Sequence, residues 1–329
     1  MGSSARLRLF INRNRPLILD GGLATELEAH GAQLQGDPLW SARLLHTNPK
    51  AIKDAHHRFL LSGADVITTA TYQASVQGFV THLGMSAERA KELLMSGVHL
   101  AREVVKNFGS GNTGPLVAGS IGSYGAYLHD TSEYTGTFAE KMTVDELKDW
   151  HRPQVEGLLA AGADLLAFET IPSIKEADAV VELLREFPDS SAWLSFSVKD
   201  ETRISDGSPF AEAVRVASRS AQLLAVGVNC CSPTVVEPLL DSASSQLSPD
   251  MSWVVYPNSG WEYDSQQGWQ ARGESSIWIP ELSRRWVKQG AALIGTMSCS
   301  PFPSAIASFA VFSLSRVLSA RWLLLHQSC

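Results

Sequence analysis

The stretch Leu223-Leu-Ala-Val-Gly-Val-Asn-Cys-Cys-Ser-Pro233 carries the pattern that decides the fold. Its first six residues form a continuous apolar run, and polar residues and a proline follow at once. A continuous apolar run, unlike an alternating one, suits a strand covered on both faces, as in a parallel sheet. The stretch therefore predicts a buried parallel strand that delivers Asn229 and Cys230 to its end.

The same pattern recurs along the chain in further short runs rich in Val, Ile and Leu. The expected strands cover residues 16–20, 64–69, 115–119, 164–169, 192–197, 224–228, 252–256 and 291–295. Segments with helical periodicity lie between them, most clearly at residues 51–62, 87–105 and 144–161. Alternation of buried strands with amphipathic helices predicts right-handed βαβ units.

Helix ends are marked in the sequence as well. Thr143 and Glu146 have the spacing of a capping box, which predicts a helix start. Gly63, Gly162 and Gly290 each stand just before an expected strand, where a left-handed residue closes the preceding helix. The periodic segments therefore have defined ends.

Eight strand–helix units in 329 residues predict an α/β fold of one domain, a (β/α)8 TIM barrel spanning residues 8–320. The alternative is a doubly wound open sheet, but no Gly-x-Gly-x-x-Gly follows any strand. Two long irregular stretches, residues 122–143 and 258–279, follow the third and seventh strands. Long loops above a barrel usually shape a site.

Composition excludes several classes of protein. The net charge of -7 and the isoelectric point near 5.7 provide no basic surface for nucleic acid. Four cysteines in a chain of this length do not form a disulfide framework, and the N-terminus lacks a secretory apolar core, so we expect a cytoplasmic protein. Arg316 and Arg321 interrupt the apolar tail, so no membrane partner is expected.

Polar residues gather where the expected strands end, which is where barrels place their chemistry. Asp20 precedes two glycines, a position that also suits a helix cap or a turn. Glu169 directly follows an apolar run, so a buried carboxylate there has to be paired or neutral. The two acids could bind a substrate ammonium group or act as an acid/base pair. Cys230 reads equally as a buried apolar residue, a nucleophile or a metal ligand.

At these residues the chain resembles the zinc-dependent homocysteine S-methyltransferases, which use S-methylmethionine or a related donor. The resemblance covers about residues 17–295. It is carried by Leu19-Asp-Gly-Gly-Leu-Ala-Thr-Glu-Leu27, Asp37-Pro-Leu-Trp-Ser41, Ala70-Thr-Tyr-Gln-Ala-Ser75, Gly119-Ser-Ile-Gly-Ser-Tyr-Gly-Ala-Tyr127, Phe168-Glu-Thr-Ile-Pro172, Gly227-Val-Asn-Cys230 and Val255-Tyr-Pro-Asn-Ser-Gly260. Many motifs in one order are far more specific than any single motif.

The resemblance implies a function and a site. It implies methyl transfer from S-methylmethionine or S-adenosylmethionine to the zinc-bound thiolate of homocysteine, giving methionine. It assigns Asp20, Gly21, Glu169 and Asn229 to substrate binding and Cys230 to zinc. The implied partners are homocysteine and a methyl-sulfonium donor, and zinc is the implied cofactor.

The sequence departs from the family after Gly295. The family pattern has an adjacent cysteine pair after the eighth strand, and this chain has Met297 and Ser298 there. A thioether and a hydroxyl lack the negative charge of thiolates, so tight zinc binding is not expected. Cys299 and Cys231 are two further candidate ligands. Residues 296–329 form a divergent C-terminal segment, and a catalytically impaired, metal-free amino-acid-binding or regulatory barrel is the alternative function.

Overall fold

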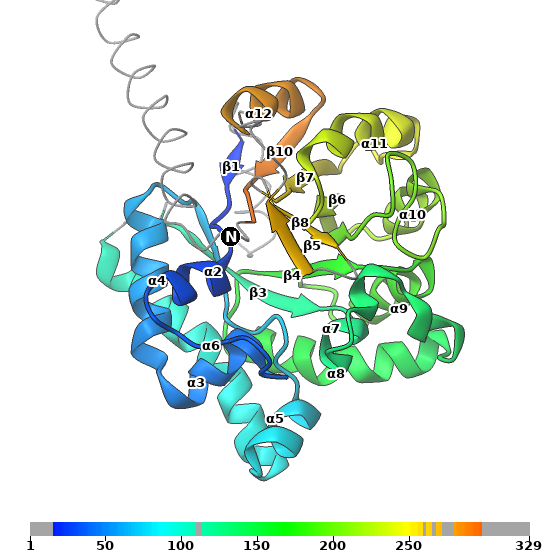
Figure 1. Cartoon of the computed structure of the whole chain (residues 1–329). Coiled ribbons are helices and arrows are strands. Elements are labelled where there is room, and N and C mark those ends of the chain that lie inside the picture. The colour runs from blue at the N-terminus through cyan, green and yellow to red at the C-terminus, as the bar shows by residue number, and fades with distance from the viewer. Residues whose placement is uncertain (1–15, 110–113, 259–260, 265–267, 272–278, 298–329) are drawn as a thin grey trace, which may run out of the picture.

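A computed structural model describes residues 16–109, 114–258, 261–264, 268–271 and 279–297. Eight parallel strands form one sheet in the order β1-β10-β7-β6-β5-β4-β3-β2 (Figure 1). A parallel bridge between Leu19 and Val66 joins the two edge strands. The sheet therefore closes into the expected (β/α)8 barrel.

The strands of the barrel agree closely with the apolar runs. They are β1 (Leu17–Ile18), β2 (Val66–Thr68), β3 (Leu116–Gly122), β4 (Leu165–Ile171), β5 (Ala192–Phe196), β6 (Leu223–Asn229), β7 (Ser252–Tyr256) and β10 (Ala291–Ile294). β3 and β4 run beyond the expected ends, because their polar terminal residues stay in register with the neighbouring strands. Glu169 remains within the sheet, paired with Gly122, and lines the cavity at the rim of the barrel.

Helices surround the barrel, as Figure 1 shows. They are α2 (Leu23–Ala29), α3 (Leu44–Thr47), α4 (Pro49–Leu61), α5 (Val76–Leu83), α6 (Ala87–Phe108), α7 (Tyr124–Leu128), α8 (Val144–Ala160), α9 (Ile174–Leu184), α10 (Phe210–Ala217), α11 (Val236–Ala243) and α12 (Ile279–Lys288). Short 3-10 turns are η1 (Trp40–Arg43), η2 (Ser132–Tyr134), η3 (Thr137–Glu140), η4 (Pro233–Val235) and η5 (Ser244–Gln246). None of the described helices is both long and apolar enough to span a bilayer.

The predicted helix ends are confirmed. Thr143 and Glu146 form the capping box of α8, with each side chain bonded to the other's backbone N–H. Gly63, Gly162 and Gly290 all have a positive φ, 96°, 90° and 100°, which a Cβ would disfavour. These glycines turn the chain from helix back to strand.

The two long stretches contain more structure than expected. Residues 122–143 hold α7, η2 and η3, and the stretch after β7 contains a hairpin of β8 (Trp261–Asp264) and β9 (Gly268–Ala271). Short helical turns and a two-stranded hairpin carry too little periodicity to be recognised in sequence.

The core has two parts, one inside the barrel and one between barrel and helices. The interior cluster includes Leu17, Leu116, Trp193 and Tyr256, and Met297 packs against it. Alternate residues of each strand point outward into the larger cluster beneath the helices. The interior is a packed core, so any site has to lie at its rim.

Candidate active site

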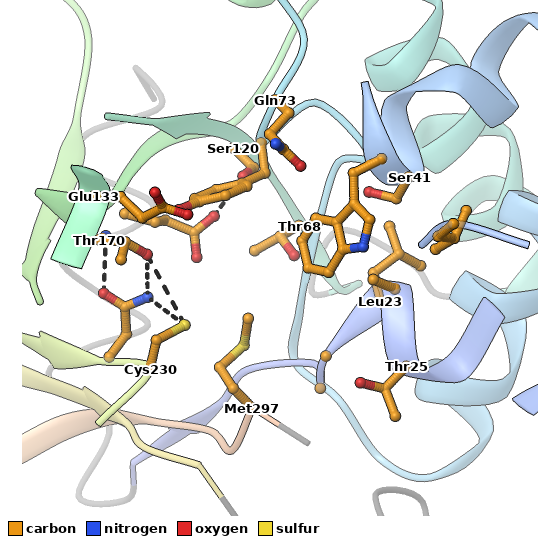
Figure 2. A pocket seen from close by; sticks show the side chains of 18 of the residues that line it. Leu23, Thr25, Ser41, Thr68, Gln73, Ser120, Glu133, Thr170, Cys230 and Met297 are labelled. Atoms are coloured by element: carbon orange, nitrogen blue, oxygen red, sulfur yellow. Dashed lines mark hydrogen bonds between the residues drawn. The ribbon is translucent and has the colours of Figure 1, made fainter. Parts of the chain in front are cut away.

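A cavity of about 500 Å³ lies at the rim formed by the carboxyl ends of the strands (Figure 2). Its lining includes Asp20, Gly21, Glu169, Asn229 and Cys230, so the structure brings together all the expected substrate-binding residues and the first metal candidate. The volume falls within the roughly 300–1,000 Å³ typical of small-molecule sites. Loops after β1 and β3 complete the walls.

Asp20 is held by the end of β2. Its carboxylate accepts the backbone N–H of Thr68 at 2.7 Å and the Thr68 hydroxyl at 3.1 Å. Only 5% of Asp20 is exposed, and burial, with the charge of Glu169 adding to it, raises its pKa well above the usual range. The hydrogen bonds to Thr68 oppose this shift without cancelling it. A cation bound beside Asp20 would restore its ionised form.

Glu169 lies at the carboxyl end of β4. Ser120 on β3 donates a hydrogen bond to Glu169 Oε1, and Tyr256 supplies a second one. Burial raises the pKa of Glu169 to about 7, and these two hydrogen bonds limit the rise. Two buried carboxyl groups with raised pKa values, facing one cavity, suit a ligand that carries positive charge.

The sheet is irregular beside Glu169. The pairing of β4 with β5 shifts between Phe168 and Ile171, and Thr170 in this bulge has a φ of 59°. A bulge turns the side chains that follow it away from regular alternation. Here it presents both Glu169 and Thr170 to the cavity.

Asn229 connects the bulge to the cysteine. Its Oδ1 accepts the Thr170 N–H at 2.9 Å, and its Nδ2 donates to Thr170 Oγ1 at 2.8 Å. The same Nδ2 lies 3.2 Å from Cys230 Sγ (Figure 2). Cys230 has a φ of 50°, a conformation that a cysteine rarely adopts. Asn229 is fully buried, and its amide orients both neighbours at the edge of the cavity.

The two adjacent cysteines have different surroundings. Cys230 lines the cavity, and burial followed by the charge of Glu169 raises the pKa of its thiol to about 12. Cys231 belongs to the hydrophobic cluster beneath the helices. Its side chain therefore lies on the other side of the chain from the cavity, which does not favour it as a partner of Cys230.

The described residues do not fit a complete zinc site. Met297 lines the cavity beside Cys230, and Figure 2 shows its side chain directed into the same space. Ser298 and the candidate Cys299 lie outside the described residues. Among the residues that are described, no three His, Cys, Asp or Glu side chains are grouped to hold a metal ion. One thiol of raised pKa and one thioether give a poor donor set for zinc.

Three cavity residues were not singled out from sequence. Tyr72 follows β2 and stands edge-on to Trp40, with 6.3 Å between ring centroids. Glu133 lies in η2, and its side chain also lines the cavity. Tyr256 accepts a hydrogen bond from Trp193 Nε1 at 3.0 Å beneath Glu169. Tyr72 and Tyr256 stand within the family motifs given above, whereas nothing in the sequence distinguished Glu133 from other acidic residues in loops.

The fold and site define a class of protein: a (β/α)8 barrel whose mouth combines buried carboxylates with a thiol and aromatic rings. Such a mouth recognises a small, positively charged ligand better than an anion. The model of the homocysteine S-methyltransferase family matches residues 17–310. The chain belongs to the homocysteine S-methyltransferase family.

Relatives are similar over nearly their whole length. A betaine-homocysteine S-methyltransferase of Drosophila melanogaster is 42% identical, over 88% of this chain and 92% of the relative. The homocysteine S-methyltransferase YbgG of Bacillus subtilis is 40% identical, over 91% and 95%. The metallated form of the Escherichia coli homocysteine methyltransferase MmuM has a TM-score of 0.81 and 36% identity, over 93% of this chain and 99% of that one.

Proposed function

We propose that this chain transfers a methyl group from a sulfonium donor, such as S-methylmethionine or S-adenosylmethionine, to the sulfur of homocysteine. The observation that carries the proposal is that Asp20, Glu169 and Cys230 line one cavity in a chain of this family. Asp20 and Glu169 would bind the ammonium group of homocysteine, and the backbone at Gly21 and the amide of Asn229 would complete that subsite.

The reaction exchanges one bond for another. The homocysteine sulfur forms a new bond to the methyl carbon, and the donor's S–CH3 bond breaks with its electron pair returning to the donor sulfur. The thiol proton is released, so a sulfonium and a thiol give two thioethers and a proton. The protein aligns the two sulfur atoms with the methyl group, and such alignment removes much of the entropic barrier.

In this proposal Cys230 is one zinc ligand, and Cys231 or Cys299 would have to supply further thiolates. A bound zinc would hold the substrate as a thiolate. The amino-acid-binding barrel without turnover is the second candidate function. It is favoured by the thioether of Met297 beside a thiol with a pKa of about 12. A free-thiol substrate suits the reducing cytoplasm, where we place the protein.

The proposal is tested with homocysteine whose carbon skeleton is labelled with carbon-13, because the donor then gives unlabelled methionine. Purified protein is incubated with labelled homocysteine and S-methylmethionine, with and without added zinc, and methionine is analysed by mass spectrometry. The proposal expects labelled methionine that is lost in Glu169→Gln. Homocysteine binding without labelled methionine in either condition would favour the second candidate.

A further inference from the structure

The segment formed by residues 129–134 makes one wall of the cavity and is held rigidly. A Cβ on Gly125 would lie 2.5 Å from the backbone nitrogen of Glu133, so α7 and η2 are in direct contact only because residue 125 is glycine. On the other side, the Ser197 hydroxyl donates to the Glu133 carbonyl at 2.6 Å. The backbone of Glu133 is therefore fixed from two directions.

One oxygen of the Glu133 carboxylate is left unsatisfied by the part of the chain that the structure describes. Its Oε2 is buried and has no hydrogen-bond partner among those residues. Burial raises the pKa of Glu133 to about 7; a hydrogen bond from its own backbone N–H limits the rise, and the charge of Asp130 adds to it. A buried polar atom without a partner in a native structure requires an explanation, and an absent ligand is one.

The other carboxylates of the cavity have protein partners, including Glu28, which accepts a hydrogen bond from Gln35 Nε2 at 2.8 Å. Asp20 accepts hydrogen bonds from Thr68, and Glu169 accepts one from Ser120. Glu133 lies on the Cys230 side of the cavity, close enough for its charge to raise the pKa of the Cys230 thiol (Figure 2). The reacting sulfur and Glu133 would therefore share one end of the cavity, whereas Asp20 lies at the end of β1.

We propose that Glu133 determines the donor specificity of this site by receiving the positive charge of the sulfonium methyl donor. The proposal rests on the proposed function and deepens it, because it assigns the donor subsite to the wall formed by residues 129–134. A sulfonium has no N–H or O–H, so it needs a negative charge rather than a hydrogen-bond acceptor. Glu133 offers that charge at the cavity wall, and its Oε2 has no hydrogen-bond partner within the described ranges.

The reaction itself predicts how Glu133 acts. Methyl transfer removes the positive charge from the donor sulfur, so attraction to Glu133 weakens from ground state to transition state. An interaction of this kind favours donor binding and does not accelerate the chemical step. Loss of the charge should therefore raise KM for the donor and leave kcat unchanged or higher. A residue needed only for folding would not produce this separation.

The test compares two ligands of one shape. S-methylmethionine is titrated against 2-amino-5-methylhexanoic acid, in which carbon replaces the sulfonium sulfur and removes its charge. Calorimetry on the full chain gives the ratio of the two affinities, and turnover is not needed. We expect the wild type to prefer the sulfonium by about tenfold or more, since each 1.4 kcal/mol of charge interaction is a factor of ten.

Three variants test whether Glu133 causes the preference for the sulfonium. Glu133→Gln should bring the affinity ratio close to one, and Glu133→Asp should keep most of it. Glu140→Gln removes the same charge from an exposed position in η3 and should leave the ratio unchanged. A wild-type ratio near one, a ratio retained in Glu133→Gln, or no binding of either ligand would overturn the proposal. The affinity for homocysteine, measured separately, should be the same in Glu133→Gln as in the wild type. If the wild type did not bind homocysteine at all, that result would count against the proposed function alone.

Discussion

Thr170 and Cys230 are 60 positions apart, yet both have left-handed backbone and both bind the side chain of Asn229. Their φ angles are 59° and 50°. Non-glycine residues in this region cost of order 1–3 kcal/mol each and persist only where surrounding contacts hold them. One buried amide therefore maintains two strained residues at the mouth of the barrel.

Asn229→Asp should destabilise the protein by about 2–3 kcal/mol. The carboxylate can still accept the Thr170 N–H, but it cannot donate to Thr170 Oγ1 or to Cys230 Sγ, and it adds a buried charge. Urea unfolding measures the loss. Asn48→Asp is the matched control, because the Asn48 side chain accepts the Ala51 N–H at the start of α4 and a carboxylate can do the same. An equal change in both variants would contradict the role of the Asn229 amide.

Glu169→Gln should weaken homocysteine binding about ten- to hundredfold while leaving thermal unfolding almost unchanged. The substitution keeps the volume and removes the charge that would face the substrate ammonium, an interaction worth roughly 1.5–3 kcal/mol. Calorimetric titration gives the affinity, and Glu201→Gln, at an exposed loop position, is the control. Unaltered affinity in Glu169→Gln would show that the ammonium binds elsewhere.

The protein as it stands should bind zinc weakly. Met297 and Ser298 provide no thiolate, so dialysis against a chelator should leave much less than one zinc per chain. Met297→Cys combined with Ser298→Cys should retain close to one zinc, measured by metal analysis, while Met297→Leu should not. Wild-type protein that keeps one zinc would be at odds with this view. Replacing Cys231 and Cys299 separately by Ser would then identify the missing ligand.

Acid should destabilise the fold through His56. Its two ring nitrogens are buried and have no hydrogen-bond partners among the residues that the structure describes, and burial lowers its pKa from 6.5 to about 4. Because the folded pKa lies below the unfolded one, stability from the neutral ring is complete above pH 6.5 and is lost as pH falls toward 4. The loss should reach about 3 kcal/mol. In His56→Leu, the free energy of unfolding measured with urea should change much less with pH over this range. His57 is an exposed neighbour, and His57→Gln should keep the pH dependence of the wild type. If the free energy of unfolding still fell with pH in His56→Leu, other titratable groups would be the cause.

The barrel could be predicted because strand and helix patterns repeat without interruption. Residues 252–256 form β7 with the expected bounds, because a covered parallel strand needs a continuous apolar run. The hairpin of β8 and β9 was not predicted, since two strands outside the main sheet need no such run. The pattern of apolar residues therefore predicts the buried strands of the barrel but not the elements outside it.

The site was predicted in part for a related reason. Asp20, Glu169, Asn229 and Cys230 stand at strand ends, and barrel geometry brings strand ends together. The bulge at Thr170 depends on pairing with β5, which local sequence does not encode. Glu133 comes from a loop, where only the fold shows that its carboxylate is buried.

We expect Asp20 and Glu169 of this cavity to bind the ammonium group of homocysteine. The most direct test is a calorimetric titration of the full chain with homocysteine and with 4-mercaptobutanoic acid, which lacks only the amino group. Homocysteine should bind at least about tenfold more tightly, as expected for a charge-assisted contact worth roughly 1.5 kcal/mol or more. Equal affinity for the two thiols, or no binding of homocysteine, would contradict it.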